Sequence, residues 1–169
     1  MRAFLAVPVS RGSDTERVER MITAIPGLRP VRTPELHVTL KFLGEIGDGE
    51  ARRISRGLSA LRFQRFSFRI EGVSAFPAPA RARVVYLSVS PEGFRHLYSE
   101  VMGLLNLGVE ADFVPHITVA RLKSPMDLRQ YAVRLDGNTE RFAEKVCLYR
   151  SDLRPDGPVY TAISCAQLM

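Results

Sequence analysis

The chain has 169 residues, of which 46% are hydrophobic and 25% charged, a composition typical of one folded globular domain with a substantial core. No stretch approaches the roughly 18 apolar residues of a membrane-spanning helix, and Pro8 and Arg11 interrupt the N-terminus too soon for a signal peptide. We therefore expect a cytoplasmic protein without a membrane partner. The net charge of +6 is a weak indication of an anionic partner such as nucleic acid.

The chain contains only two cysteines, Cys147 and Cys165. Both lie in apolar, strand-like segments, and they lack the Cys-x-x-Cys spacing of redox and zinc motifs. This context favours two reduced, packed thiols over a disulfide or a metal site.

In the first half of the chain, strands are predicted to alternate with amphipathic helices. Ser13 and Glu16 have the spacing of a capping box, so a helix should begin there and end at Pro26-Gly27. The proline-containing segment 29–35 is expected to be a loop. Apolar residues at helical spacing predict a second helix over 48–61. Alternating apolar residues predict strands over 2–8, 37–43, 66–73 and 83–89.

The second half of the chain shows a similar alternation. A helix is expected over 91–107, with a buried stripe that includes Leu104, and His96 lies off that stripe as a surface residue without a catalytic part. Ser124-Pro125 could open a short helix through Tyr131. The remaining predicted strands cover 116–122, 141–149 and 158–166. The last two are joined by the turn-rich segment 151–157.

This order of elements predicts an α+β fold, because strands and helices repeat roughly across the midpoint of the chain. We expect a single domain, residues 1–169, made of two similar lobes related by a pseudo-twofold axis. Two mainly antiparallel sheets would line a central groove, with the helices outside.

The most informative feature is a repeated motif. The segment His37-Val38-Thr39-Leu40-Lys41-Phe42-Leu43 recurs 79 residues later as His116-Ile117-Thr118-Val119-Ala120-Arg121-Leu122. Successive side chains of a strand point to opposite faces, so each His shares a face with its Thr while the branched residues face the core. One His-x-Thr is a weak signal, but two copies, one in each half of the chain, are much less expected by chance.

The chemistry open to two His-x-Thr strands is restricted by what accompanies them. No carboxylate or third histidine stands at metal-ligand spacing, no Gly-x-Ser-x-Gly nucleophile motif occurs, and there is no glycine-rich phosphate loop. Two imidazoles can act as acid and base near neutral pH. A phosphodiester is the substrate that suits them, with the hydroxyls of Thr39 and Thr118 bonding the phosphoryl oxygens.

The chain resembles the 2H phosphoesterases, which are named for paired His-x-Thr/Ser motifs, and within them the RNA 2′,3′-cyclic phosphodiesterases, also called 2′-5′ RNA ligases. The resemblance implies a bilobal fold, no metal or other cofactor, and opening of a 2′,3′-cyclic phosphate to a 2′-phosphate. It assigns His37 as proton donor and His116 as proton acceptor, an order that the nearly symmetric motifs do not settle. The resembling segments are 1–7, 35–45, 75–77, 115–121, 149–151 and 157–160.

The expected partner is an RNA with a 2′,3′-cyclic phosphate end or a small cyclic nucleotide. Its binding residues are expected to be Arg121, Lys41, Tyr149, Ser151 and Tyr160. Two alternatives stay open at this point, which are 2′-5′ ligation of RNA halves such as tRNA halves, and a module that binds RNA ends or nucleotides without turnover. A monomer is expected because one chain already supplies both histidines.

Overall fold

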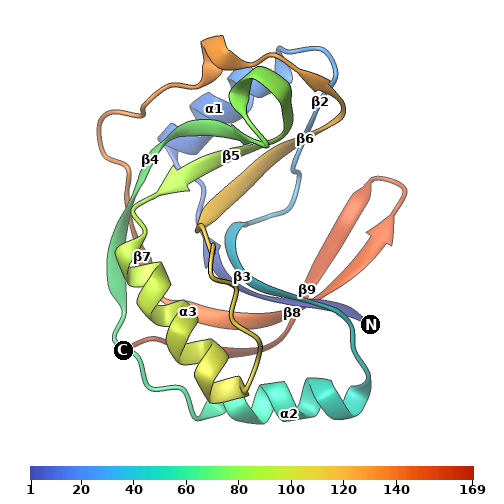
Figure 1. Ribbon diagram of the computed structural model, residues 1–169, viewed down its shortest axis with the longest axis vertical. Helices are drawn as coiled ribbons and strands as arrows, with labels where there is room; N and C mark the ends of the chain where they lie inside the picture. Colours follow the sequence, from blue (N-terminus) through green and yellow to red (C-terminus); the bar gives the residue numbers. More distant parts are fainter.

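The computed structural model describes residues 1–169, and its strands and helices form an α+β fold, as predicted (Figure 1). None of the three α-helices is both long and apolar enough to cross a membrane. The elements are β1 (Arg2–Val9), α1 (Ser13–Thr23), β2 (Leu28–Pro30), β3 (Leu36–Glu45), α2 (Asp48–Ser59), β4 (Phe66–Phe76), β5 (Ala82–Val89), α3 (Glu92–Leu105), β6 (His116–Met126), β7 (Glu140–Ala143), β8 (Lys145–Arg154) and β9 (Gly157–Gln167), with short 3-10 helices at Pro79–Arg81 and Arg129–Tyr131.

All strands belong to one curled antiparallel sheet of nine strands, in the order β7-β4-β5-β6-β3-β1-β8-β9, with β2 beside β6. The two sheets that we expected are thus joined into one. Their junction is narrow, because β3 and β6 pair only through Val38 and Ile117.

The strand order is symmetric about this junction. On one side β6 is followed by β5 and β4, and on the other side β3 is followed by β1 and β8. The strands before the two motif strands, β1 and β5, therefore occupy equivalent places beside them.

The residues behind the motifs lie in the core, as predicted. Val38 and Ile117 are 0% exposed, and Leu40 and Val119 are also buried. They belong to one continuous cluster of buried apolar side chains, to which α2 contributes residues such as Ile54. The polar residues between them, which are only half-buried, must point to the opposite face of the sheet.

The start of the first helix differs from the expected capping box. The N-cap is Gly12, one residue before Ser13, and its backbone N–H donates to the Thr15 hydroxyl over 2.9 Å. The carboxylate of the next residue, Asp14, is buried and accepts two hydrogen bonds from Arg141, the shorter of 2.6 Å. Sequence spacing cannot reveal this ion pair, which joins the first turn of the helix to β7.

The segment 29–35 is not entirely a loop, because its beginning forms β2. Leu28, Arg29 and Pro30 pair with β6, and the Val31 N–H donates to the Val119 carbonyl over 2.9 Å. Pro30 is tolerated there because β2 is a short strand beside a single neighbour.

Several boundaries in the second half of the chain also differ from the predictions. Ser124-Pro125 does not open a helix, since β6 continues through Met126 and only a 3-10 turn follows. The strand predicted over 141–149 is divided between β7 and β8. Leu104 lies on the solvent side of α3, 41% exposed. Antiparallel pairing of β8 with β9 up to Arg154 and Gly157 shortens the expected turn to two residues.

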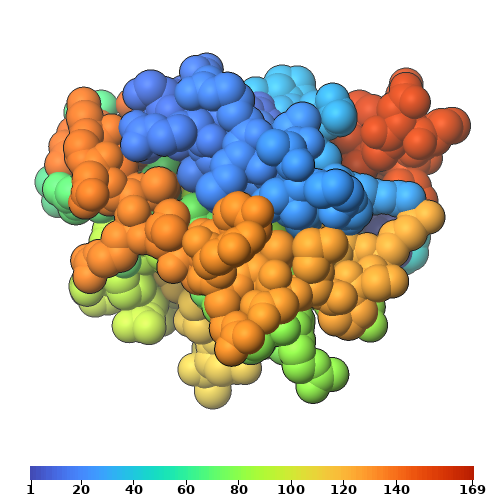
Figure 2. Space-filling model, turned by 90° about the horizontal axis from the view of Figure 1, so that it is seen from above, coloured from blue at the N-terminus to red at the C-terminus, as the bar shows by residue number.

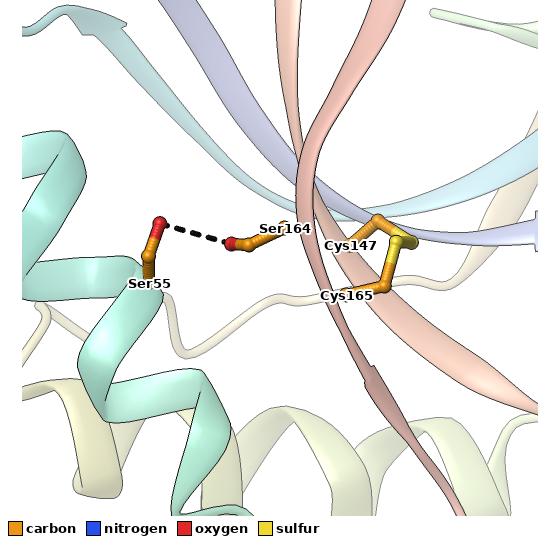
Figure 3. Close-up of a disulfide and its surroundings, with 4 residues drawn as sticks. All are labelled: Ser55, Cys147, Ser164 and Cys165. Carbon is orange, nitrogen blue, oxygen red and sulfur yellow. Dashed lines mark hydrogen bonds between the residues drawn. A yellow bond between two sulfur atoms is a disulfide. The ribbon is translucent and has the colours of Figure 1, made fainter.

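The cysteines form a disulfide, so the expectation of two reduced thiols is wrong. Cys147 on β8 and Cys165 on β9 are directly opposite each other, with their Cα atoms 4.1 Å apart (Figure 3). The register of the β8–β9 hairpin brings the two cysteines together. Their separation of 18 residues, without a recognisable motif, does not reveal this pairing in the sequence. The adjacent Ser164 faces the other way and bonds the Ser55 hydroxyl of α2 over 2.9 Å.

We predict that replacing Ile117 by Ala lowers the free energy of unfolding by about 2–5 kcal/mol, because the change leaves a cavity where the sheet is narrowest. Urea unfolding followed by circular dichroism measures this loss. The matched control is Val109→Ala, at a side chain that is 66% exposed, which should change stability by less than about 0.5 kcal/mol. Equal effects of the two substitutions would contradict the assigned role of the Val38–Ile117 junction.

Candidate active site

The two motifs lie side by side on one face of the sheet, which we call the motif face. Val38 and Ile117 are antiparallel partners that point into the core, so the residues flanking them point to the opposite side. The motif face therefore carries His37, Thr39, His116 and Thr118, all half-buried. Because β3 and β6 run antiparallel, His37 lies toward Thr118, and Thr39 lies toward His116.

The imidazole of His37 is enclosed by aromatic rings. Its centroid lies 5.2 Å from that of Phe4 and 5.3 Å from that of Tyr160. Burial lowers the pKa of His37, and positive charge on His116 and on Arg121 acts in the same direction, so that together they bring this pKa to about 4. His37 is thus neutral at pH 7 in the free protein.

His116 has a matching aromatic environment. Its ring lies 5.0 Å from Phe76 and 5.4 Å from Tyr86. Its Nδ1 lies 2.8 Å from the Val114 carbonyl oxygen, which can only accept a hydrogen bond. Nδ1 therefore carries the proton, and Nε2 of the neutral ring is left with a free lone pair. This tautomer can accept a proton on Nε2.

Arg121 reaches the motif face because of a β-bulge. The register of β5 with β6 shifts between the pairs Val85–Ala120 and Tyr86–Thr118, so β6 contains one extra residue there. Simple alternation from Thr118 would place Ala120 on the motif face, but Ala120 is buried and Arg121 is exposed. The charge of Arg121 acts on the pKa values of both His37 and Tyr160.

Lys41 is not brought to the motif face. A second register shift, between the pairs Leu5–Lys41 and Ala6–Thr39, turns Lys41 to the same side as the buried Leu5. Its ammonium lies 3.3 Å from a carboxylate oxygen of Glu110. Substrate contact at Lys41 stays a prediction, although the side chain is paired with Glu110 away from the motif face.

Phe42 occupies the motif face where Lys41 was expected. It pairs with Phe4, which lies against His37, and its side chain is 70% exposed. The repeat held a signal for this residue, because Phe42 stands at the position that Arg121 has in the second copy. Nothing in the sequence marks Phe4 itself, which is an ordinary apolar residue of a buried strand.

The three other predicted binding residues lie on the motif face. Tyr149 pairs with Phe4 and stacks on it at 5.3 Å, and Ser151 pairs with Tyr160 on the neighbouring strand. Burial raises the pKa of Tyr149 to about 12, with a contribution from the negative charge of Glu35. Burial also raises the pKa of Tyr160, against the effect of Arg121. Both phenols are therefore protonated hydrogen-bond donors at neutral pH.

No group of three or more His, Cys, Asp or Glu side chains is arranged to hold a metal ion. The motif face offers the two imidazoles, the hydroxyls of Thr39, Thr118 and Ser151, two phenols and the guanidinium of Arg121. The lone pair on His116, the nearby cation and the hydroxyl donors suit an anionic substrate that exchanges protons with the protein.

Comparison with known proteins identifies the family. The family model of LigT-like phosphoesterases matches residues 9–86. The chain is 36% identical to the RNA 2′,3′-cyclic phosphodiesterase of Methanothermobacter thermautotrophicus, with 99% of each chain covered. It is 35% identical to the protein of the same name in Archaeoglobus fulgidus, over 95% of this chain and 96% of the relative.

A solved structure agrees with this relationship. The protein TT0787 of Thermus thermophilus superposes with a TM-score of 0.81 at 29% identity, covering 99% of this chain and 98% of that chain. The chain belongs to the LigT-like phosphoesterase family, and the resemblance to the 2H phosphoesterases is thereby confirmed.

The lowered pKa of His37 predicts a loss of stability in acid. The folded protein binds the His37 proton only near pH 4, whereas the unfolded chain binds it near pH 6.5, so stability falls as the pH drops through this window. The loss reaches at most about 3 kcal/mol. His37→Gln should remove this component, which urea unfolding at pH 7 and pH 4.5 in phosphate-free buffer can measure. An identical acid loss in the variant would contradict the lowered pKa.

Proposed function

We propose that the protein hydrolyses the 2′,3′-cyclic phosphate ends of RNA to 2′-phosphates, with His37 and His116 as acid and base. The observation that carries this proposal is the pairing of Val38 with Ile117, which puts both His-x-Thr pairs on one face of the sheet. The relatives named RNA 2′,3′-cyclic phosphodiesterase support it, since they match nearly the whole chain.

His116 is assigned as the base that activates water. Its Nδ1 is occupied by the Val114 carbonyl, so Nε2 can take the proton of the attacking water. The water oxygen forms a bond to phosphorus as the bond from phosphorus to the ribose 3′ oxygen breaks. The two imidazoles must then act on opposite sides of the phosphorus, one at the entering and one at the leaving oxygen.

His37 is assigned as the acid that donates a proton to the departing 3′ oxygen, which leaves the phosphate on the 2′ oxygen. Its pKa of about 4 in the free protein means that it must gain a proton when substrate binds. The negative charge of a cyclic phosphate provides this effect, because an anion beside the imidazole raises its pKa. Substrate binding and protonation of His37 are therefore coupled.

The other residues of the motif face stabilise charge and orient the substrate. Thr39 and Thr118 would donate hydrogen bonds to the non-bridging phosphoryl oxygens, and Arg121 would neutralise the charge that develops on them. Tyr149, Ser151 and Tyr160 line the same face on the β8–β9 side, where the nucleoside would lie.

The remaining proposals concern the setting of the reaction. We infer that one domain of two similar lobes, residues 1–169, acts as a monomer, because both histidines come from one chain. We also propose that the protein acts in the cytoplasm, on RNA substrates.

The substrate assay uses a short RNA ending in a 2′,3′-cyclic phosphate, incubated with the protein in EDTA. We expect a product that ends in a 2′-phosphate, identified by its resistance to an enzyme specific for 3′-phosphates. A 3′-phosphate product, or activity that requires added metal, would contradict the mechanism. Supplying 5′-hydroxyl RNA and searching for a 2′-5′ junction tests ligation. A single-turnover experiment without product would favour a binding module.

The pH dependence tests the roles of the two histidines. Wild-type kcat/KM should show a bell-shaped dependence on pH, whose two limbs report the macroscopic pKa values of the histidine pair. His116→Gln should leave only a descending limb, because activity then depends on protonated His37. His37→Gln should leave only an ascending limb. Each substitution should lower kcat/KM by about 10²–10⁴.

Coupling between substrate and His37 gives a second signature in the same data. In His116→Gln, the descending limb of kcat should lie at higher pH than that of kcat/KM, since kcat reports the complex and kcat/KM the free protein. Near wild-type rates with an unchanged bell in either variant would remove that histidine from the mechanism.

A further inference from the structure

Two arginines face each other across β2 and β6. Arg29 and Arg121 are directly opposite partners in this antiparallel pair, so their side chains lie on the same side of the sheet. Both are exposed. In the space-filling view from above, the blue atoms of the segment that contains β2 lie against the amber atoms that follow the second motif (Figure 2).

This pair lacks a counter-charge. Several other arginines are neutralised by carboxylates, as Arg141 is by Asp14, whereas neither Arg29 nor Arg121 forms an ion pair or a side-chain hydrogen bond. Like charges directly opposite each other in a sheet are destabilising. An anion bound there would relieve the repulsion, and the planar guanidinium is well suited to phosphate.

Arg29 lies farther from the two histidines than the Val38–Ile117 rung does. Val38 and Arg29 both lie along the same edge of β6, opposite Ile117 and Arg121. Because of the bulge in β6, these two positions are only three residues of β5 apart, roughly 10 Å along the strand. The charge of Arg121, on β6, lowers the pKa of His37, whereas Arg29 is on β2, the strand beyond. Arg121 therefore serves the reaction centre, and Arg29 lies beyond it.

We propose that Arg29 forms a second phosphate subsite, which binds the phosphate on the 5′ side of the terminal nucleoside. This inference rests on the proposed function and specifies its substrate class. Ends of RNA chains carry that phosphate, as do 5′-phosphorylated cyclic nucleotides, whereas a simple nucleoside 2′,3′-cyclic phosphate does not. The protein is accordingly built for RNA ends more than for small cyclic nucleotides.

The test compares three substrates, which are adenosine 2′,3′-cyclic phosphate, its 5′-phosphorylated form, and the dinucleotide ApA with a terminal cyclic phosphate. Wild type should show a kcat/KM about tenfold higher for the two substrates with a 5′-side phosphate, mainly through KM. In Arg29→Gln this preference ratio should fall to about one. Arg29→Lys should keep part of the ratio, because it retains the charge but not the planar fork.

The matched control is Arg52→Gln, which removes the same charge from an exposed residue of α2. It should leave the preference ratio at its wild-type value, and thermal unfolding should show that all variants are folded. An unchanged ratio in Arg29→Gln overturns the subsite while the proposed function stands. Absence of hydrolysis of all three substrates by wild type would instead reject the proposed function.

A binding measurement tests the subsite independently of turnover. Wild type should bind ApA with a terminal 2′-phosphate about tenfold more tightly than adenosine 2′-phosphate, and Arg29→Gln should abolish this difference. For the dinucleotide, the logarithm of affinity falls with the logarithm of salt concentration. In Arg29→Gln this slope should be less steep than in wild type by about 0.7, because one phosphate contact is lost. Equal affinities and slopes in wild type and variant would overturn the inference.

Discussion

The candidate site depends on a single buried rung of the sheet, the pair formed by Val38 and Ile117. Both side chains are 0% exposed, so the core holds the two motif strands in register although they share almost no ladder. Each residue is flanked by the His and Thr of its own motif. Apolar packing behind the sheet thereby determines where four polar groups lie in front of it.

The electrostatics of the motif face follow from this arrangement. Two imidazoles and a guanidinium lie near one another, and one of the imidazoles, that of His37, is half-buried against aromatic rings. Such a site disfavours its own protonation and favours an anion. In the free protein the arginine at this site is therefore charged and His37 is neutral. His37 becomes protonated at neutral pH only when an anion binds beside it.

The sequence predicts the parts of this site that depend on regular alternation. The strands, their buried residues and the shared face of the two His-x-Thr pairs all follow from a period of two. Lys41 and Arg121 depart from that period because bulges in β3 and β6 shift the phase, and nothing in the local sequence marks these bulges. Sequence analysis predicted both Arg121 and Lys41 as binding residues, and the bulges put only Arg121 on the motif face.

Features that depend on which strands become neighbours could not be predicted from the sequence either. The disulfide requires the register of β8 with β9, and the facing arginines require β2, a segment whose prolines favour a loop. The ion pair of Asp14 with Arg141 joins residues 127 positions apart. Each of these contacts is set by topology, which a single sequence without a partner strand does not contain.

The symmetric strand order has a consequence for how the chain is connected. Each side of the sheet takes its third strand from the opposite half of the sequence, since β4 follows β5 on one side and β8 follows β1 on the other. The polypeptide therefore passes back and forth between the two sides, and neither half of the gene encodes a complete side. Because each side needs a strand from the other half of the chain, we expect the two sides to unfold together and neither half to fold alone.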